Sequence, residues 1–257
     1  MSFHEMHFQY DGMKSSDMGV CLISTSTGLK ERPFFADREL NFELIPNNDT
    51  PYYYSTKTQP FRISLQLAPL DGKWTSELKS SVSRWLNNGK FNEFYTTDDI
   101  NRVYFLMHTG SPTLHTTSSN EGYIQIEFIN IDCYARSQER KEIYEVKSNN
   151  QATIIETVNV GDAPLYPVLQ IQKFGAGDIS IRNLHDGGQV FSFTNIDNME
   201  ELYVDCQHRY IRTSLMNTYR YDDFSGYYLK LPYGKNRLEV SGKCKLSIAY
   251  RYKFLSQ

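Results

Sequence analysis

Alternation of apolar and polar residues with a period of two constrains this chain more than any other feature. It is plainest in three segments, residues 39–45, 61–67 and 122–129. In the first of them, Leu40, Phe42 and Leu44 fall on one face, and the segment stops at the turn-forming cluster Pro46–Asp49. This period is typical of β-strands that bury one face. The N-terminal half is therefore predicted to consist mainly of short strands.

The C-terminal half follows the same pattern with shorter spacing. Strands are predicted at residues 152–156, 168–172, 179–181, 190–193, 201–206, 209–211, 237–240 and 245–250. Glycine-containing turns separate most of them, and we interpret Gly175–Asp178 as a hairpin turn and His185–Gly188 as a tight turn. Short strands at this spacing indicate a β-sandwich or jelly roll.

One helix interrupts the strands. The residues Trp74, Leu78, Val82, Trp85 and Leu86 share one face at helical spacing. Thr75 can cap its N-terminus, and Gly89 stands where a left-handed residue ends a helix, so we predict a helix at 75–88. Because both tryptophans lie on the apolar face, we interpret them as core residues and not as a platform for a sugar or a partner.

The remaining N-terminal segments complete a first domain. Further strands are predicted at Phe3–Tyr10, Val20–Ile23 and Arg102–His108, and the Ser-, Thr-, Pro- and Gly-rich stretch Thr109–Asn120 is predicted to be a loop. The polar stretch Arg136–Asn150 contains the expected boundary. The predicted domains are residues 1–135, a β domain with the helix, and residues 136–257, a β-sandwich.

Composition bears on the partners of the chain. Aromatic residues make up 14%, with 19 Tyr and 15 Phe, which suits either an aromatic β core or a surface for protein contacts. The net charge is −3, and residues 1–135 carry 11 basic and 16 acidic side chains. This balance gives no basic footprint for nucleic acid.

The cysteines and the N-terminus indicate synthesis in a reducing cytosol. Cys21, Cys133, Cys206 and Cys244 have no metal-ligand spacing, so we expect free thiols. The N-terminus predicts no signal peptide, and no apolar run approaches the roughly 20 residues of a membrane span.

No catalytic constellation is found. Neither GxSxG nor HExxH occurs, and His4 and His7 would face opposite sides of a strand. The paired acids Asp98–Asp99, Glu200–Glu201 and Asp222–Asp223 are adjacent, so their side chains point apart, unlike the facing carboxylates of a glycosidase. The other histidines are dispersed, at His108, His115, His185 and His208. We predict no catalytic, cofactor-binding or metal-binding residue, and the binding residues stay undefined.

Several motifs in order resemble the distal tail protein family of siphophages. These motifs are Phe8–Gly12 followed by Asp17–Val20, the helix end Ser83–Leu86 followed by Phe94–Tyr104, the second-domain segment Asn159–Pro167, and the last segment Leu231–Gly242. One departure is the turn Pro46–Thr50, where the family usually has a G-R-D-G-like sequence.

The resemblance implies a structural, non-enzymatic protein of the virion, at the tip of the phage tail. Such proteins form a homohexameric ring from the N-terminal domain and project a galectin-like C-terminal domain. The implied partners are other copies of the chain, the tail tube protein, the tail-associated fibre or lysin protein and, in some phages, receptor-binding proteins. DNA would pass through the ring only in transit, and neither a membrane nor a cofactor is implied.

Two other functions stay open on the residues alone. The first is a carbohydrate-binding β-sandwich module, although residues 136–257 contain no Trp for stacking on a sugar and only His208–Tyr210 faintly resembles a galectin polar strand. The second is a polysaccharide hydrolase.

Overall fold

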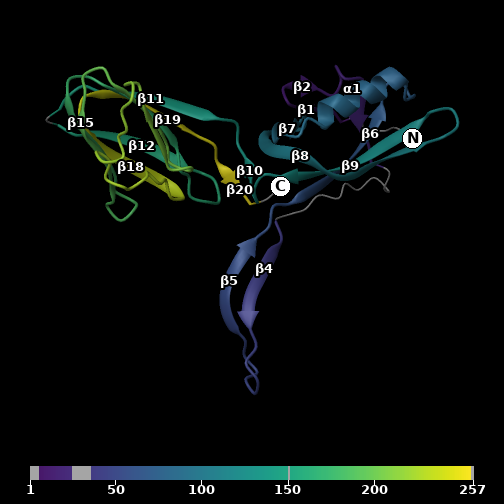
Figure 1. The fold of residues 1–257 in the computed structure, drawn as a ribbon, viewed down its shortest axis with the longest axis horizontal. Helices are drawn as coiled ribbons and strands as arrows, with labels where there is room; N and C mark the ends of the chain where they lie inside the picture. Colours follow the sequence, from purple (N-terminus) through teal and green to yellow (C-terminus); the bar gives the residue numbers. More distant parts are fainter. Residues whose placement is uncertain (1–5, 25–35, 150, 256–257) are drawn as a thin grey trace. The chain divides into compact units, whose positions relative to one another are not determined.

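The computed structural model describes residues 6–24, 36–149 and 151–255, and the chain forms two compact units (Figure 1). The first unit extends to Arg136 and includes Leu255, and the second is Ser137–Phe254. Both are built mainly from strands, and the described residues contain a single helix, α1 (Ser76–Leu86). The predicted mainly β class, with one helix in the N-terminal half, is therefore confirmed.

The first unit contains a large sheet and a separate pair of strands. Its strands are β1 (Phe8–Tyr10), β2 (Met13–Lys14), β3 (Val20–Leu22), β4 (Arg38–Glu43), β5 (Tyr52–Thr58), β6 (Arg62–Pro69), β7 (Asn92–Thr96), β8 (Asp99–Thr116), β9 (Gly122–Asn130) and β10 (Ala135–Arg136). The large sheet has the order β2-β1-β7-β8-β9-β6-β3, and β10 pairs with β8. The segment before Met6, and with it His4, lies outside the described residues.

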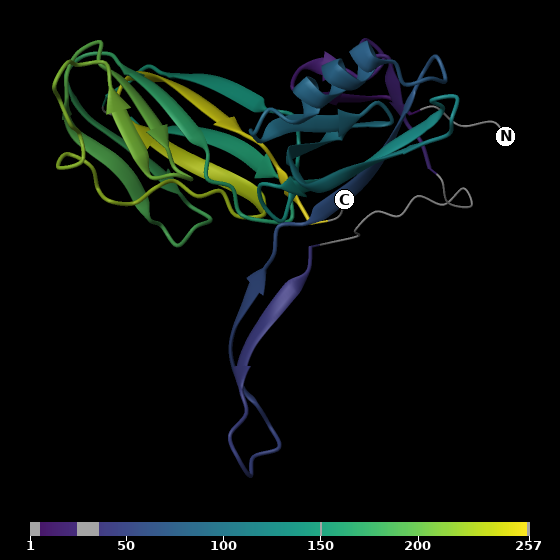
Figure 2. The same cartoon turned by 45° about the vertical axis from the view of Figure 1, so that its right-hand side comes forward.

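Helix α1 packs against this sheet through its aromatic face (Figure 2). Thr75 caps it as predicted, its side chain accepting a hydrogen bond from the backbone N–H of Leu78 at 3.2 Å. Trp85 stacks on Phe8 at 5.5 Å between ring centroids and donates its indole N–H to the carbonyl of Tyr10 at 3.0 Å. The prediction that the tryptophans are core residues is confirmed, because Trp74 and Trp85 are both buried.

The predicted loop Thr109–Asn120 is wrong for most of its length. Strand β8 continues to Thr116 and pairs with β9, for example Leu114 with Ile124, and only the last few residues form the turn. The register shifts between Thr109 and Thr113. A bulge of this kind accommodates glycine and proline, which is why a loop-like composition occurs within a strand.

The second unit is a two-layered sandwich. Its strands are β11 (Arg140–Val146), β12 (Thr153–Asn159), β13 (Val168–Lys173), β14 (Gly177–Asn183), β15 (Val190–Ile196), β16 (Glu201–Asp205), β17 (Tyr210–Thr213), β18 (Gly234–Ser241), β19 (Cys244–Tyr250) and β20 (Lys253–Phe254). One sheet has the order β11-β19-β13-β16-β17, and the other has the order β12-β18-β14-β15. Alternate residues of both sheets form one apolar core, which includes Leu169, Phe191, Leu238 and Leu246.

Two details of the second half differ from the prediction. The polar stretch Arg136–Asn150 contains strand β11, which is missing from the predicted strands because its side chains are largely charged. Gly175–Asp178 is not a hairpin turn, because β13 and β14 belong to different sheets and the segment crosses between them. His185–Gly188 does join the antiparallel neighbours β14 and β15, as predicted.

All four cysteines are free thiols, and Cys21, Cys206 and Cys244 are buried among apolar side chains. Within the described residues, no helix is long and apolar enough to cross a membrane.

Candidate assembly surface

The strands β4 and β5 form a two-stranded sheet of their own, the arm, which consists of residues 38–58 (Figure 1). All six residues of β4 and most of β5 are exposed. Cross-strand pairs run from Arg38–Thr58 to Glu43–Tyr52, with a bulge after Asn41. The alternating apolar residues that predicted this strand are therefore not buried within the described part of the chain.

The arm has one apolar face and one polar face. Residues directly opposite in an antiparallel pair share a face. Leu40 pairs with Thr56, and Phe42 pairs with Tyr53. The intervening pairs, Glu39–Lys57, Asn41–Ser55 and Glu43–Tyr52, form the polar face. Such an amphipathic hairpin is suited to bury its apolar face against another surface.

Local hydrogen bonds order the arm without burying it. The Tyr54 hydroxyl donates to Glu43 Oε2 at 2.6 Å, and this bond raises the pKa of Tyr54. At the predicted turn Pro46–Thr50, the backbone N–H of Asn48 donates to the carbonyl of Ile45 at 3.0 Å. A preformed arm loses less conformational entropy when it binds than a disordered segment would.

The histidines and adjacent acids remain dispersed. His7 lies beside Ser15, His115 stacks on Tyr123, and His208 Nδ1 is 2.8 Å from Asp205. Among the described residues, no three His, Cys, Asp or Glu side chains come together as a metal site.

One charged cluster has no counterpart among the sequence predictions. Glu200, which is almost fully buried, accepts hydrogen bonds from Arg220 Nε at 2.9 Å and Nη2 at 2.7 Å. Arg220 also donates to Asp223 at 2.9 Å, and Thr213 donates to Glu200 at 2.5 Å. Burial opposes ionisation of Glu200, but the bonds from Arg220 and Thr213 prevail and hold its pKa below the ordinary value. The cluster fastens the segment after β17 to the start of β16, which is a structural role.

Of the acids adjacent in sequence, Glu200 and Glu201 point apart, as predicted. Glu200 faces the interior, while Glu201 lies on the exposed side of β16. Asp99 accepts a hydrogen bond from the backbone N–H of Asn101, and Asp223 accepts one from Arg220. No sequence signal identified Arg220, because 20 residues separate it from Glu200.

Comparisons with known proteins agree with this architecture. A family described as phage tail protein N-terminal domain matches residues 3–132, and one described as phage tail C-terminal domain matches residues 134–250. The SPbeta prophage-derived protein YomH of Bacillus subtilis (strain 168) is 28% identical over 97% of this chain and 98% of its own length.

Two solved structures share the fold. The crystal structure of the Dit (gp 19.1) protein of phage SPP1 has a TM-score of 0.70 at 14% identity, covering 97% of this chain and 99% of that one. A chain of the phage P2 baseplate has a TM-score of 0.52 at 10% identity, covering 95% of this chain and 97% of that one. The SPP1 protein is a paradigm of the hub adsorption apparatus in Gram-positive infecting phages.

The two matching family models, together with the fold, define a structural component of a phage tail. The chain belongs to the phage tail protein family whose two domains match nearly its whole length. Its resemblance to the siphophage distal tail proteins is confirmed.

Proposed function

We propose that the chain forms a ring of six copies at the tip of the phage tail and acts there as the distal tail hub. The observation that carries the proposal is the arm, whose apolar face is exposed although the sequence alternates as if to bury it. In the ring, the arm of each copy lies against the first unit of the next copy.

Exposure of the arm is the physical argument for a second copy. Leu40, Phe42 and Leu44 each expose half or more of their surface, and Tyr53 exposes 62%. Large contiguous apolar patches are uncommon on soluble monomers and mark surfaces for partners. A contact that repeats around a ring covers every arm once, without requiring a different partner protein.

The hub joins the tail tube on one side to the tail-associated fibre or lysin protein on the other. The second unit, with a galectin-like fold, is available to receptor-binding proteins. The acidic first half fits a bore through which DNA must pass without being held, since phosphate attraction would retard it. The protein acts without catalysis, and its place is the tail tip of the virion.

Light scattering on the full chain tests the ring. Six copies of the 29.9 kDa chain have a mass of about 180 kDa. We expect this mass at high concentration, together with six-fold annuli in negative-stain micrographs. A monomer at every concentration, with no annulus in purified virions, would contradict the proposal.

A further inference from the structure

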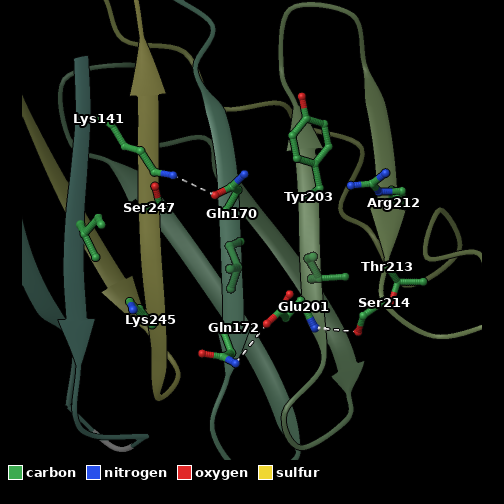
Figure 3. Close-up of a pocket in the computed structure, with 13 residues that line it drawn as sticks. Lys141, Gln170, Gln172, Glu201, Tyr203, Arg212, Thr213, Ser214, Lys245 and Ser247 are labelled. Atoms are coloured by element: carbon green, nitrogen blue, oxygen red, sulfur yellow. Dashed lines mark hydrogen bonds between the residues drawn. The ribbon is translucent and has the colours of Figure 1, made fainter. Parts of the chain in front are cut away.

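The five-stranded sheet of the second unit carries a groove of about 610 Å³ on its outer face (Figure 3). This volume lies within the range of about 300–1,000 Å³ that is typical of small-molecule sites. The groove spans all five strands of the sheet, from Lys141 on β11 to Arg212 on β17.

Register places one row of side chains across the floor of the groove. Direct cross-strand partners connect Ile143, Ser247, Gln170, Tyr203 and Arg212, in that order from β11 to β17. Because partners on adjacent strands share a face, all five side chains lie on the groove side. The centre of the row is thus an amide, a hydroxyl and an aromatic ring.

Two cations converge on the centre of this row from opposite edges of the sheet. Lys141 reaches across β19, and its Nζ lies 3.3 Å from Gln170 Oε1. From the other edge, the guanidinium carbon of Arg212 lies 5.4 Å from the centroid of the Tyr203 ring. Since Gln170 and Tyr203 are direct partners, the two charges lie above neighbouring side chains, and Figure 3 shows both pointing inward.

The lining of the groove carries three cations, Lys141, Lys245 and Arg212, and one carboxylate, Glu201. Glu201 accepts a hydrogen bond from Gln172 at 3.1 Å, and Asp205 is bound by His208 at 2.8 Å. No ion pair joins Lys141 or Arg212 to a carboxylate within the part of the chain that the structure describes. The lining therefore has a net positive charge, which favours an anion in the groove.

Ser247 supplies an independent sign of a missing ligand. It exposes only 8% of its surface, and its Oγ has no hydrogen-bond partner among the residues described. Buried hydroxyls are normally satisfied, and leaving one unpaired costs stability. Ser247 is the direct partner of Gln170, whose Oε1 lies 3.3 Å from Lys141 Nζ.

We propose that this groove binds an acidic carbohydrate, that is, a sugar or polyol that carries a phosphate or carboxylate group. The fork of Arg212 and the ammonium of Lys141 hold the negative group, because guanidinium matches the geometry of such oxyanions. Gln170, Gln172 and Ser247 hydrogen-bond the hydroxyl groups. The absence of Trp from this half of the chain argued against a neutral sugar held by stacking, whereas here charge supplies the affinity.

The test uses isothermal titration calorimetry on the full chain at low salt. The probes are a poly(glycerol phosphate) oligomer, hexagalacturonic acid, neutral maltohexaose, inorganic phosphate and a single-stranded DNA 12-mer. We expect at least one acidic oligomer to bind and maltohexaose not to bind, and the preferred oligomer identifies phosphate or carboxylate. Any of three results would overturn the proposal. These are no binding heat from either acidic oligomer, full competition by equimolar inorganic phosphate, and binding of the DNA as tight as that of the acidic oligomers.

Variants locate the binding in the groove. Arg212→Gln and Lys141→Gln should each weaken binding by about tenfold, the usual effect of losing one charge-assisted hydrogen bond. Ser247→Ala should weaken binding without lowering the melting temperature, because it removes a hydroxyl that lacks a partner in the fold. Arg182→Gln on β14, an exposed arginine of the other sheet, is the matched control and should bind like the parent. Equal affinity of all four variants would place the ligand elsewhere and refute the assignment.

Discussion

Removing the apolar face of the arm should dissociate the proposed ring of six copies while leaving the fold intact. The variant carries Leu40→Ser, Phe42→Ser and Leu44→Ser, whose parent side chains expose 57%, 50% and 66% of their surface. Full burial of such a side chain stabilises by about 1.5–3 kcal/mol, so the exposed half of each contributes about 1–1.5 kcal/mol in an interface. The three together contribute about 3–4 kcal/mol for each arm. At about 1.4 kcal/mol per factor of ten, each contact weakens by roughly 100- to 1,000-fold.

Sedimentation velocity over a concentration series measures this effect. We expect the parent near the mass of six copies and the triple variant as a monomer at the same micromolar concentration. At a dilution where both are monomeric, their melting temperatures should agree, because these side chains are largely exposed within the chain. The control replaces three exposed apolar residues of the second unit, Ile154, Val158 and Val160, by Ser, and it should assemble normally. Assembly of the arm variant at the parent's concentration would refute the reasoning.

The remaining predictions concern the second unit. Arg220→Met should destabilise the fold by about 3–5 kcal/mol in chemical denaturation, because it leaves the carboxylate of Glu200 buried and unpaired, and adding Glu200→Gln should recover part of the loss. Folding lowers the pKa of Glu200, so the ionised carboxylate contributes its full stabilisation above the ordinary pKa of 4.5. That stabilisation is lost as the pH falls through the pKa of the folded state. The parent should therefore lose more stability on acidification below pH 4.5 than the Glu200→Gln variant does. Gly242→Ala should lower the melting temperature strongly, because the new Cβ would lie 2.5 Å from the carbonyl oxygen of Asp178 at a φ of +99°, whereas Gly187→Ala, with open space around it, should cost only about 1 kcal/mol. Equal decreases in melting temperature for the two glycine variants would show that the contact between the new Cβ at position 242 and the Asp178 carbonyl does not determine the loss of stability.

Periodicity predicted most elements because their burial follows their local pattern. The helix is the clearest case, since Trp74, Val82 and Trp85 recur at helical spacing and Thr75 provides a cap. Those signals are contained in one short segment. The predicted end at Gly89 is late, because the helix ends at Leu86 and Asn87 is its C-cap.

The errors arose where distant pairing overrides local composition. Gly110 and Pro112 read as loop residues, yet they occupy a bulge that is held in the sheet by pairing with β9. The sequence indicates a turn at Gly175, but the residues of a turn do not determine whether the next strand pairs in the same sheet or in the other one. The same limit applies to the groove, because Lys141 and Arg212 are 71 positions apart and line one groove only through the order of five strands.

In the proposed ring, the arm has a geometric consequence for the number of copies. A hairpin that docks onto a different patch of an identical neighbour makes a heterologous, head-to-tail contact. Such a contact either closes after a whole number of steps or propagates as an open helical filament. The angle between arm and receiving patch therefore sets the copy number, so a bend of the base of the hairpin, near Arg38 and Thr58, would change the symmetry of the particle or convert it into fibres.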